Sequence, residues 1–205
     1  MADDEVVEDE VAVQDGALDA GRPRRRVAPF VALGLVVVLA GLIVVLAGAK
    51  GGTDDTAESP LVGRAAPAVV STTFDGDAFD LGRRRGSWVV LNFFNSTCVP
   101  CVREHPELLA FAEAQADLGV DAAELYTIVN DDSDEAVRDF FADNGITWPI
   151  VHDDDGTIAV AFGVAKVPET WVVSPTGVVV ARFTGQVSAD GLAATLEQLR
   201  AAGSP

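Results

Sequence analysis

The chain has 205 residues, which suggests one domain with additional segments. Its formal net charge is −18, so a surface of clustered Lys and Arg for nucleic-acid phosphates is not expected, and nucleic-acid binding is excluded. The chain has only two cysteines, which excludes a small fold held together by several disulfides.

The N-terminal region predicts a membrane anchor. Residues 1–26 are acidic, end in a basic cluster and are expected to form a disordered cytoplasmic tail. Residues 27–49 carry no charge, and a helix of that length would reach about 34 Å, enough for a hydrocarbon core of about 30 Å. Arginines precede this run, so we expect the N-terminus inside and an uncleaved single-pass anchor in the cytoplasmic membrane.

Two other interpretations of this run remain open. A cleaved signal peptide is one, because residues 47–49 are small, although the apolar run is longer than a usual signal core. A buried core helix is the other, and a charge-free run of this length disfavours it. Residues 50–60 are rich in small and polar residues and predict a linker, after which residues 61–205 form the extracytoplasmic domain.

The domain is expected to alternate strands and helices. A continuous apolar run predicts a buried central strand, and turn signals predict a hairpin near each end of the domain. The sequence therefore predicts an α/β fold whose central mixed sheet has flanking helices. The expected strands are 69–73, 78–81, 88–94, 124–129, 146–151, 169–173 and 178–183, and the expected helices are 99–116, 133–144, 157–162 and 188–202.

The two cysteines form a Cys98-Val99-Pro100-Cys101 motif between the central strand and a helix. The first turn of a helix has unpaired N–H groups and a positive dipole end, which would stabilise a thiolate at Cys98. Cys101 lies close enough to attack a mixed disulfide on Cys98 and release the product. Pro100 falls in the first turn, where its missing N–H costs little. The pattern indicates redox chemistry.

Other uses of the cysteines are less favoured. A disulfide that closes so short a loop would add little stability. A four-ligand zinc site would need two further ligands, for which only His105 and His152 are available besides carboxylates. Val102 occupies the position where covalent haem attachment needs His. We therefore expect no metal and no cofactor beyond a redox-active Cys98–Cys101 disulfide.

Three segments carry a resemblance to a known family. Leu91–Cys101 resembles the active-site strand and helix start of TlpA-like and ResA-like thioredoxin-fold proteins, and Phe162–Thr170 resembles their cis-proline segment. Val129–Ser133 matches the layout between them, and the resemblance covers about residues 60–202. It implies a thioredoxin-like fold, a membrane anchor, a membrane electron donor, and extracytoplasmic thiol–disulfide exchange with exported clients such as apocytochrome c.

The resemblance also implies roles for individual residues. Pro168 corresponds to the cis-proline beside the cysteines, and the backbone of Val167 could pair with an extended client, so Pro100, Val167 and Pro168 are the expected client-contacting residues. Glu104 corresponds to a glutamate that tunes the cysteines, although a solvated helix position is the alternative. Thr97 replaces the family's usual Trp, which leaves client identity and redox poise open.

The expected function is reduction of protein disulfides outside the membrane, with apocytochrome c as the leading client. A general reductase or isomerase with other clients is the alternative. A peroxidase is disfavoured because Asn95 stands where that chemistry needs Thr. A copper-binding assembly protein resembling the SCO group is a further alternative. Such proteins use CxxxC and a distant His, for which His152 is the candidate here, whereas the spacing of Cys98 and Cys101 is CxxC. We expect His105 at the surface and Asp153–Gly156 as a turn, with an incidental cation site as the lesser interpretation.

Overall fold

The computed structural model describes residues 28–48 and 59–203, which belong to two separate units. The first contains α1 (Ala28–Gly48), which confirms a helix within the predicted anchor. Only residues 31–41 of α1 are described with their side chains, and these are exposed. Among the described residues, no helix has the length and apolar character needed to cross a membrane. The span over residues 27–49 stays a prediction, and the tail 1–26 and most of the linker 50–60 lie outside the described residues.

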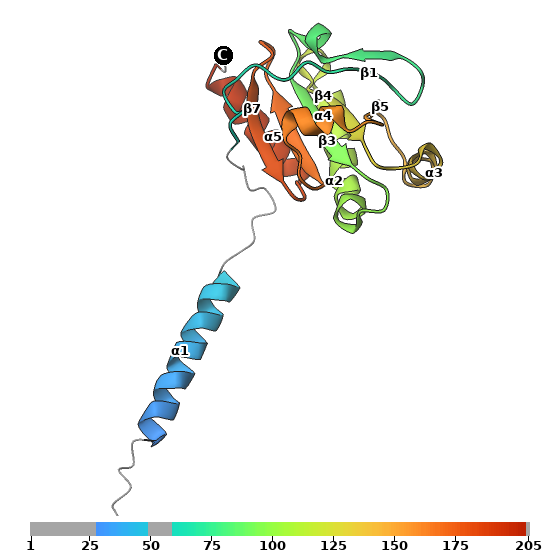
Figure 1. The fold of residues 1–205 in the computed structure, drawn as a ribbon. Coiled ribbons are helices and arrows are strands. Elements are labelled where there is room, and N and C mark those ends of the chain that lie inside the picture. Colours follow the sequence, from blue (N-terminus) through green and yellow to red (C-terminus); the bar gives the residue numbers. More distant parts are fainter. Residues whose placement is uncertain (1–27, 49–58, 204–205) are drawn as a thin grey trace, which may run out of the picture. The chain divides into compact units, whose positions relative to one another are not determined.

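The second unit is built on a five-stranded mixed sheet in the order β5-β4-β3-β6-β7 (Figure 1). The three strands on one side are parallel, and β6 and β7 continue the sheet in antiparallel fashion. The central strand β3 has every residue buried, as its apolar sequence predicts. The strands are β3 (Val89–Phe94), β4 (Glu124–Val129), β5 (Ile150–His152), β6 (Glu169–Val173) and β7 (Val179–Thr184).

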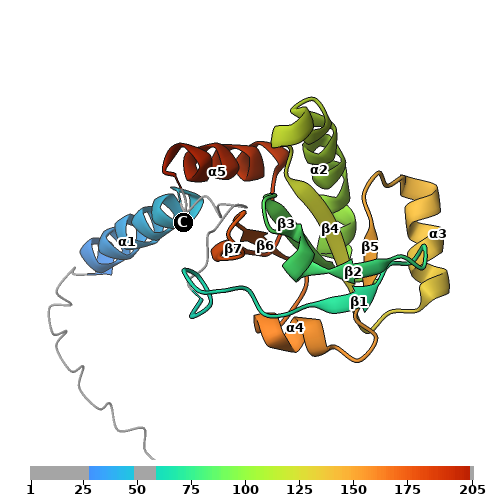
Figure 2. The same cartoon turned by 90° about the horizontal axis from the view of Figure 1, so that it is seen from above.

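Both faces of the sheet are covered. Figure 2 shows α2 (Val99–Ala116) and α5 (Ala189–Ala201) on one face of the sheet. On the other face lie α4 (Thr157–Phe162) and the small hairpin of β1 (Val70–Thr72) and β2 (Ala78–Asp80). Each layer has its own buried cluster, because alternate strand residues point to opposite faces. A third cluster lies around α3 (Asp134–Asn144) and includes Cys101. The predicted α/β architecture is confirmed.

Local sequence signals set the helix boundaries. The Ser133 and Ser188 side chains each accept a backbone N–H in the first turn of the following helix, as N-caps do. The helix α3 ends before Gly145, whose φ of 81° lies in the left-handed region that favours glycine. The predicted boundaries of these helices therefore agree with the structure to within one residue.

The predicted strand 146–151 is largely wrong. The strand β5 begins only at Ile150, where it pairs with Thr127. Pro149 has no N–H to donate to a ladder, so an apolar segment that contains it cannot pair throughout. The preceding residues are instead packed as a connection, and the Trp148 indole N–H donates to the Thr127 hydroxyl at 2.9 Å.

The remaining elements lie near the ends of the predicted segments. The hairpin strands are shorter than expected, and two single turns of 3-10 helix were not predicted. These elements are β1 (Val70–Thr72), β2 (Ala78–Asp80), η1 (Leu81–Arg84) and η2 (Gly119–Asp121).

The segment that leads into the hairpin contacts both edge strands of the sheet. At one edge, the Gly63 N–H donates to the Val179 carbonyl at 2.8 Å, and the Val179 N–H donates to the Arg64 carbonyl at 2.9 Å. At the other edge, the Phe74 N–H donates to the Ile150 carbonyl at 2.9 Å. One stretch of chain thus crosses a face of the sheet and bonds to β7 and β5.

Candidate redox site

The cysteine motif lies where β3 leads into α2, as predicted. Cys98 is the N-cap of α2, and Pro100 follows in its first turn. The Cys101 N–H points at the Cys98 Sγ atom, 3.3 Å away. A negative charge on Cys98 would therefore meet a backbone donor and the positive end of the helix dipole.

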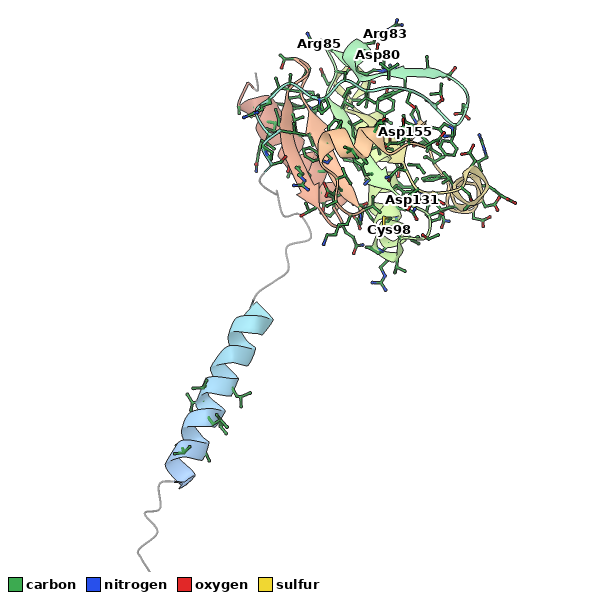
Figure 3. All side chains as sticks on the ribbon, in the orientation of Figure 1. Asp80, Arg83, Arg85, Cys98, Asp131 and Asp155 are labelled. Carbon is green, nitrogen blue, oxygen red and sulfur yellow. A yellow bond between two sulfur atoms is a disulfide. The ribbon has the colours of Figure 1, made fainter. Side chains whose placement is uncertain are left out.

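The two cysteines form a disulfide, with their Cα atoms 5.2 Å apart. Their exposure differs, because Cys98 is half-buried and Cys101 is completely buried in the cluster around α3. Figure 3 shows Cys98 close to Asp131, whereas Asp80 and Arg83 lie at the opposite end of the domain. A client can therefore approach the Cys98 sulfur, and Cys101 is protected from solvent.

The predicted cis-proline segment lies against the cysteines. The Val167–Pro168 peptide bond is cis, which confirms the prediction from the sequence. The Val167 carbonyl oxygen lies 3.6 Å from the Cys98 Sγ atom. The structure thus brings Val167, the residue before the cis-proline, together with Cys98, although the two are 69 residues apart in sequence. Pro168 itself is buried.

A groove runs from Cys98 along the cis-proline segment. Thr97 lines it, so a small hydroxyl residue occupies a position where the resembled family has a bulky indole. The other lining residues come from three loops: Asn95, Asn130, Asp131, Val164, Ala165, Lys166 and Val167. Its lining is mixed in polarity.

The loop before Cys98 is held by the loop after β4. The Asn95 amide donates to the Asp131 carbonyl at 2.7 Å. The Ser96 backbone N–H and hydroxyl both donate to the Asp132 carboxylate, the hydroxyl at 3.1 Å. Asp131 has a φ of 53°, a left-handed conformation that Asp tolerates better than most residues. No local sequence signal indicates the role of Asp132, because the contact joins residues 36 positions apart.

Glu104 is completely buried, so the solvated helix position is wrong. One carboxyl oxygen accepts the Val187 backbone N–H at 2.8 Å, and the other accepts the Asn92 side-chain amide at 3.0 Å. Burial raises the pKa of Glu104 to about 7, and these two hydrogen bonds oppose the rise only in part. Glu104 lies one helical turn beyond Cys101, and a carboxyl group with such a pKa can exchange a proton near neutral pH.

Asn92 and Thr170 complete the surroundings of Glu104, and Thr170 was not predicted as a site residue. The Asn92 amide also donates to the Thr170 hydroxyl at 3.0 Å, and both side chains are completely buried. Thr170 comes from β6, two residues after Pro168. No sequence motif marks this pairing, because it depends on the register between β3 and β6, in which Asn92 lies opposite Thr170.

His105 is buried, so the prediction of a surface position is wrong. Its ring lies among the aromatic rings of Phe140, Phe141 and Trp148. The Nε2 atom is 2.7 Å from the Gly145 carbonyl, an acceptor for its proton. Burial lowers the pKa of His105. The neutral ring is therefore part of the packing between α2 and α3.

His152 lies in a different cluster from the cysteines. Its Nδ1 atom is 3.2 Å from Asp154 and 3.7 Å from the first residue of α3, Asp134. Among the described residues these three could offer ligand atoms to a metal ion, since the atoms lie within 4.8 Å of one another. Both carboxylates are exposed, and a hydrogen bond between the ring and Asp154 accounts for the same geometry without an ion.

Comparison with known proteins identifies the family. The model of the AhpC/TSA family matches residues 62–182, which is more than half of the chain and includes both the cysteines and the cis-proline. The chain belongs to the AhpC/TSA family. Within the AhpC/TSA match lie four of the five sheet strands in full and most of β7.

Within the AhpC/TSA family, this chain is similar to proteins of thiol–disulfide exchange. HelX of Rhodobacter capsulatus, a thiol:disulfide interchange protein, is 30% identical over 69% of this chain and 78% of its own length. ResA of Bacillus subtilis, a thiol-disulfide oxidoreductase, is 30% identical over 64% of this chain and 72% of its own. The thioredoxin domain of an oxidoreductase from Bacteroides vulgatus is 24% identical, covers 69% of this chain and 99% of its own, and superposes with a TM-score of 0.59.

The fold of the AhpC/TSA chain is therefore thioredoxin-like, as predicted. The resemblance to ResA-like proteins is confirmed by the relatives themselves. Thiol–disulfide exchange is the chemistry that these relatives and the Cys98–Cys101 site have in common.

Proposed function

We propose that this thiol–disulfide oxidoreductase reduces disulfides of exported proteins outside the cytoplasmic membrane. The observation that carries the proposal is the asymmetry of the cysteine pair. Cys98 is half-buried at a helix N-terminus beside the Val167 carbonyl, and Cys101 is buried behind it. This arrangement supports Cys98 as the attacking thiol and Cys101 as the resolving thiol.

Reduction of a client takes two exchange steps. In the first, the Cys98 thiolate attacks one sulfur of the client disulfide, and the other client sulfur leaves as a thiolate that takes a proton from water. In the second, Cys101 loses its proton and attacks the Cys98 sulfur of the mixed disulfide, which releases the second client thiolate. The client gains two electrons, and the Cys98–Cys101 pair loses two as its disulfide forms.

Glu104 serves as the acceptor of the Cys101 proton in the second step. It is one helical turn away, it is sealed from solvent, and its pKa of about 7 suits proton transfer near neutral pH. A carboxylate one helical turn from Cys101 also disfavours a thiolate there, because like charges repel. A thiolate that is less stabilised favours a reducing pair.

The direction of exchange can be measured by redox titration of the full chain in glutathione or dithiothreitol buffers. A reductase requires a midpoint well below that of strong oxidants, which lie at about −120 mV. A midpoint close to −120 mV would refute the proposal. The absence of a His between the two cysteines supports the reducing direction, because no positive charge there stabilises the thiolate.

Clients can be identified by trapping on Cys101→Ala, which should accumulate mixed disulfides because the resolving thiol is missing. Cys98→Ala is the matched control and should trap nothing. We expect apocytochrome c among the trapped proteins, as the family resemblance implies. Trapping of unrelated exported proteins would point to a general reductase or isomerase, and trapping by Cys98→Ala instead would reverse the assignment of the thiols.

The proposed location needs a separate test. The arginines before residue 27 favour an inside N-terminus and a catalytic domain outside, anchored by residues 27–49. A reductase outside the membrane must be kept reduced, so a membrane electron donor is part of the proposal. A C-terminal reporter that is active only after export should be active, and activity of a cytoplasmic reporter instead would reverse the topology.

A further inference from the structure

The hydrogen bonds around Glu104 fit only one protonation state of its carboxyl group, the carboxylate. Each of its carboxyl oxygens faces a donor, the Val187 backbone N–H at 2.8 Å and the Asn92 amide at 3.0 Å. The second amide hydrogen of Asn92 is directed to the Thr170 hydroxyl at 3.0 Å. This arrangement is complementary to a carboxylate, which only accepts hydrogen bonds.

Asn92 itself is imperfectly matched to its site. Its side-chain oxygen is buried and has no hydrogen-bond partner among the described residues. A buried polar atom without a partner costs stability, so its presence in the centre of a strand needs an explanation. The side-chain NH2 group of Asn92 donates both of its hydrogens, whereas the side-chain oxygen accepts none from the described residues.

When Glu104 is protonated, its new O–H needs a hydrogen-bond acceptor instead of a donor. A proton on the oxygen that faces Asn92 meets an N–H donor, and a proton on the other oxygen meets the Val187 N–H. The Val187 donor belongs to the backbone and cannot change direction. The Asn92 amide can, because a half-turn of its terminal group exchanges the oxygen and the nitrogen. After the half-turn, the oxygen accepts the carboxyl O–H and the Thr170 hydroxyl together.

We propose that Asn92 is a positioning residue whose side-chain amide turns end for end whenever Glu104 gains or loses its proton. With the carboxylate it presents two donors, and with the carboxylic acid it presents an acceptor. One end of the amide is without a partner in each state, so the two states have similar hydrogen-bond counts. This inference rests on the proposed role of Glu104 as the proton acceptor for Cys101.

Within residues 59–203, we find no other charged side chain that faces the Glu104 carboxyl group. On α2, Cys101 is one turn before Glu104, and Arg103 and Glu107 are exposed. The His105 ring is turned toward the aromatic residues of α3. On β6, Thr170 faces Glu104, whereas the paired Glu169 and Arg182 lie with Trp171 on the opposite face of the sheet. From the connection before α5, the Val187 backbone N–H donates to Glu104. The rise of the Glu104 pKa comes from burial and has no charged group among its causes.

The chain is suited to a direct test, because its only asparagines are Asn92, Asn95, Asn130 and Asn144. The oxidised full chain is labelled with 15N-asparagine, and the side-chain amide signals are followed from about pH 5 to about pH 9, around the pKa of about 7. We expect both Asn92 amide protons to change shift with one midpoint, shared with the signal of a 13C-labelled Glu104 carboxyl group. Their through-space contacts with the Thr170 side chain should be present above that midpoint and lost below it, which titration of Glu104 without the half-turn would not cause. Asn144, whose amide donates to the Phe140 carbonyl at the surface, is the internal control and should not follow that midpoint.

Glu104→Gln provides the matched variant. Its amide donates permanently to the Asn92 oxygen, so the Asn92 signals should stay at the low-pH position of the wild type at every pH. Two outcomes overturn the inference: Asn92 signals that do not follow the Glu104 carboxyl group in the wild type, or signals that still titrate in Glu104→Gln. The experiment uses no client, so an inactive reductase with the expected titration refutes the proposed function alone.

Discussion

Replacement of Glu104 by Gln should remove a large pH dependence from the stability of the protein. Burial raises the pKa of Glu104 from 4.5 to about 7. Each unit of pKa rise corresponds to about 1.4 kcal/mol in the free energy of unfolding. The folded state therefore binds more protons than the unfolded state between about pH 4.5 and about pH 7. The stabilisation is complete below pH 4.5 and is lost as the pH rises through about 7, a change of about 3 kcal/mol.

The assay is urea unfolding of the oxidised full chain at a series of pH values. Glu113→Gln is the control, because it removes one carboxylate from an exposed position on the same helix. From about pH 4.5 to about pH 8, the free energy of unfolding of Glu104→Gln should rise by about 3 kcal/mol relative to that of Glu113→Gln. Parallel curves for the two variants would show that burial does not perturb Glu104 and would remove the physical basis of its proposed role.

Three further predictions concern other parts of the domain. His105→Gln should reduce the loss of stability in acid, because the lowered pKa of His105 makes the folded state resist protonation as the pH falls below 6.5; an unchanged acid limb in urea unfolding would contradict this. Trp171→Ala should lower the free energy of unfolding by about 3–5 kcal/mol, since the ring is completely buried against Phe162, and a loss below about 1 kcal/mol would refute that packing. Copper titration of the reduced chain should show no tight one-to-one binding. Tight binding in the wild type that is lost in His152→Ala would favour a copper-assembly function instead.

The cysteine site could be predicted because its signals are local. A buried strand followed by a helix start fixes where Cys98 and Cys101 lie, and α2 has the predicted bounds 99–116. The cis-proline required the family resemblance, since nothing near Val167–Pro168 in the sequence says that it meets Cys98. Its placement depends on the antiparallel pairing of β3 with β6.

The burial of Glu104 and His105 could not be predicted from the helix sequence alone. Both are polar residues on a helix of mixed pattern, and such residues are usually exposed. Each is buried by partners from distant segments, Asn92 and Val187 for the glutamate and α3 for the histidine. The sequence of α2 alone does not indicate which distant segments cover these two side chains.

The chain segment that contacts both edge strands has a consequence for handling the protein. An uncovered edge strand presents unpaired N–H and C=O groups to neighbouring molecules and promotes aggregation. Here residues 63–66 bond to the start of β7, and Thr73 and Phe74 bond to β5, so one stretch of chain pairs with part of each edge strand (Figure 2). A shortened version that begins after Ala66 would uncover the Val179 backbone and should self-associate, whereas one that begins before Leu61 keeps the bonds to both edge strands.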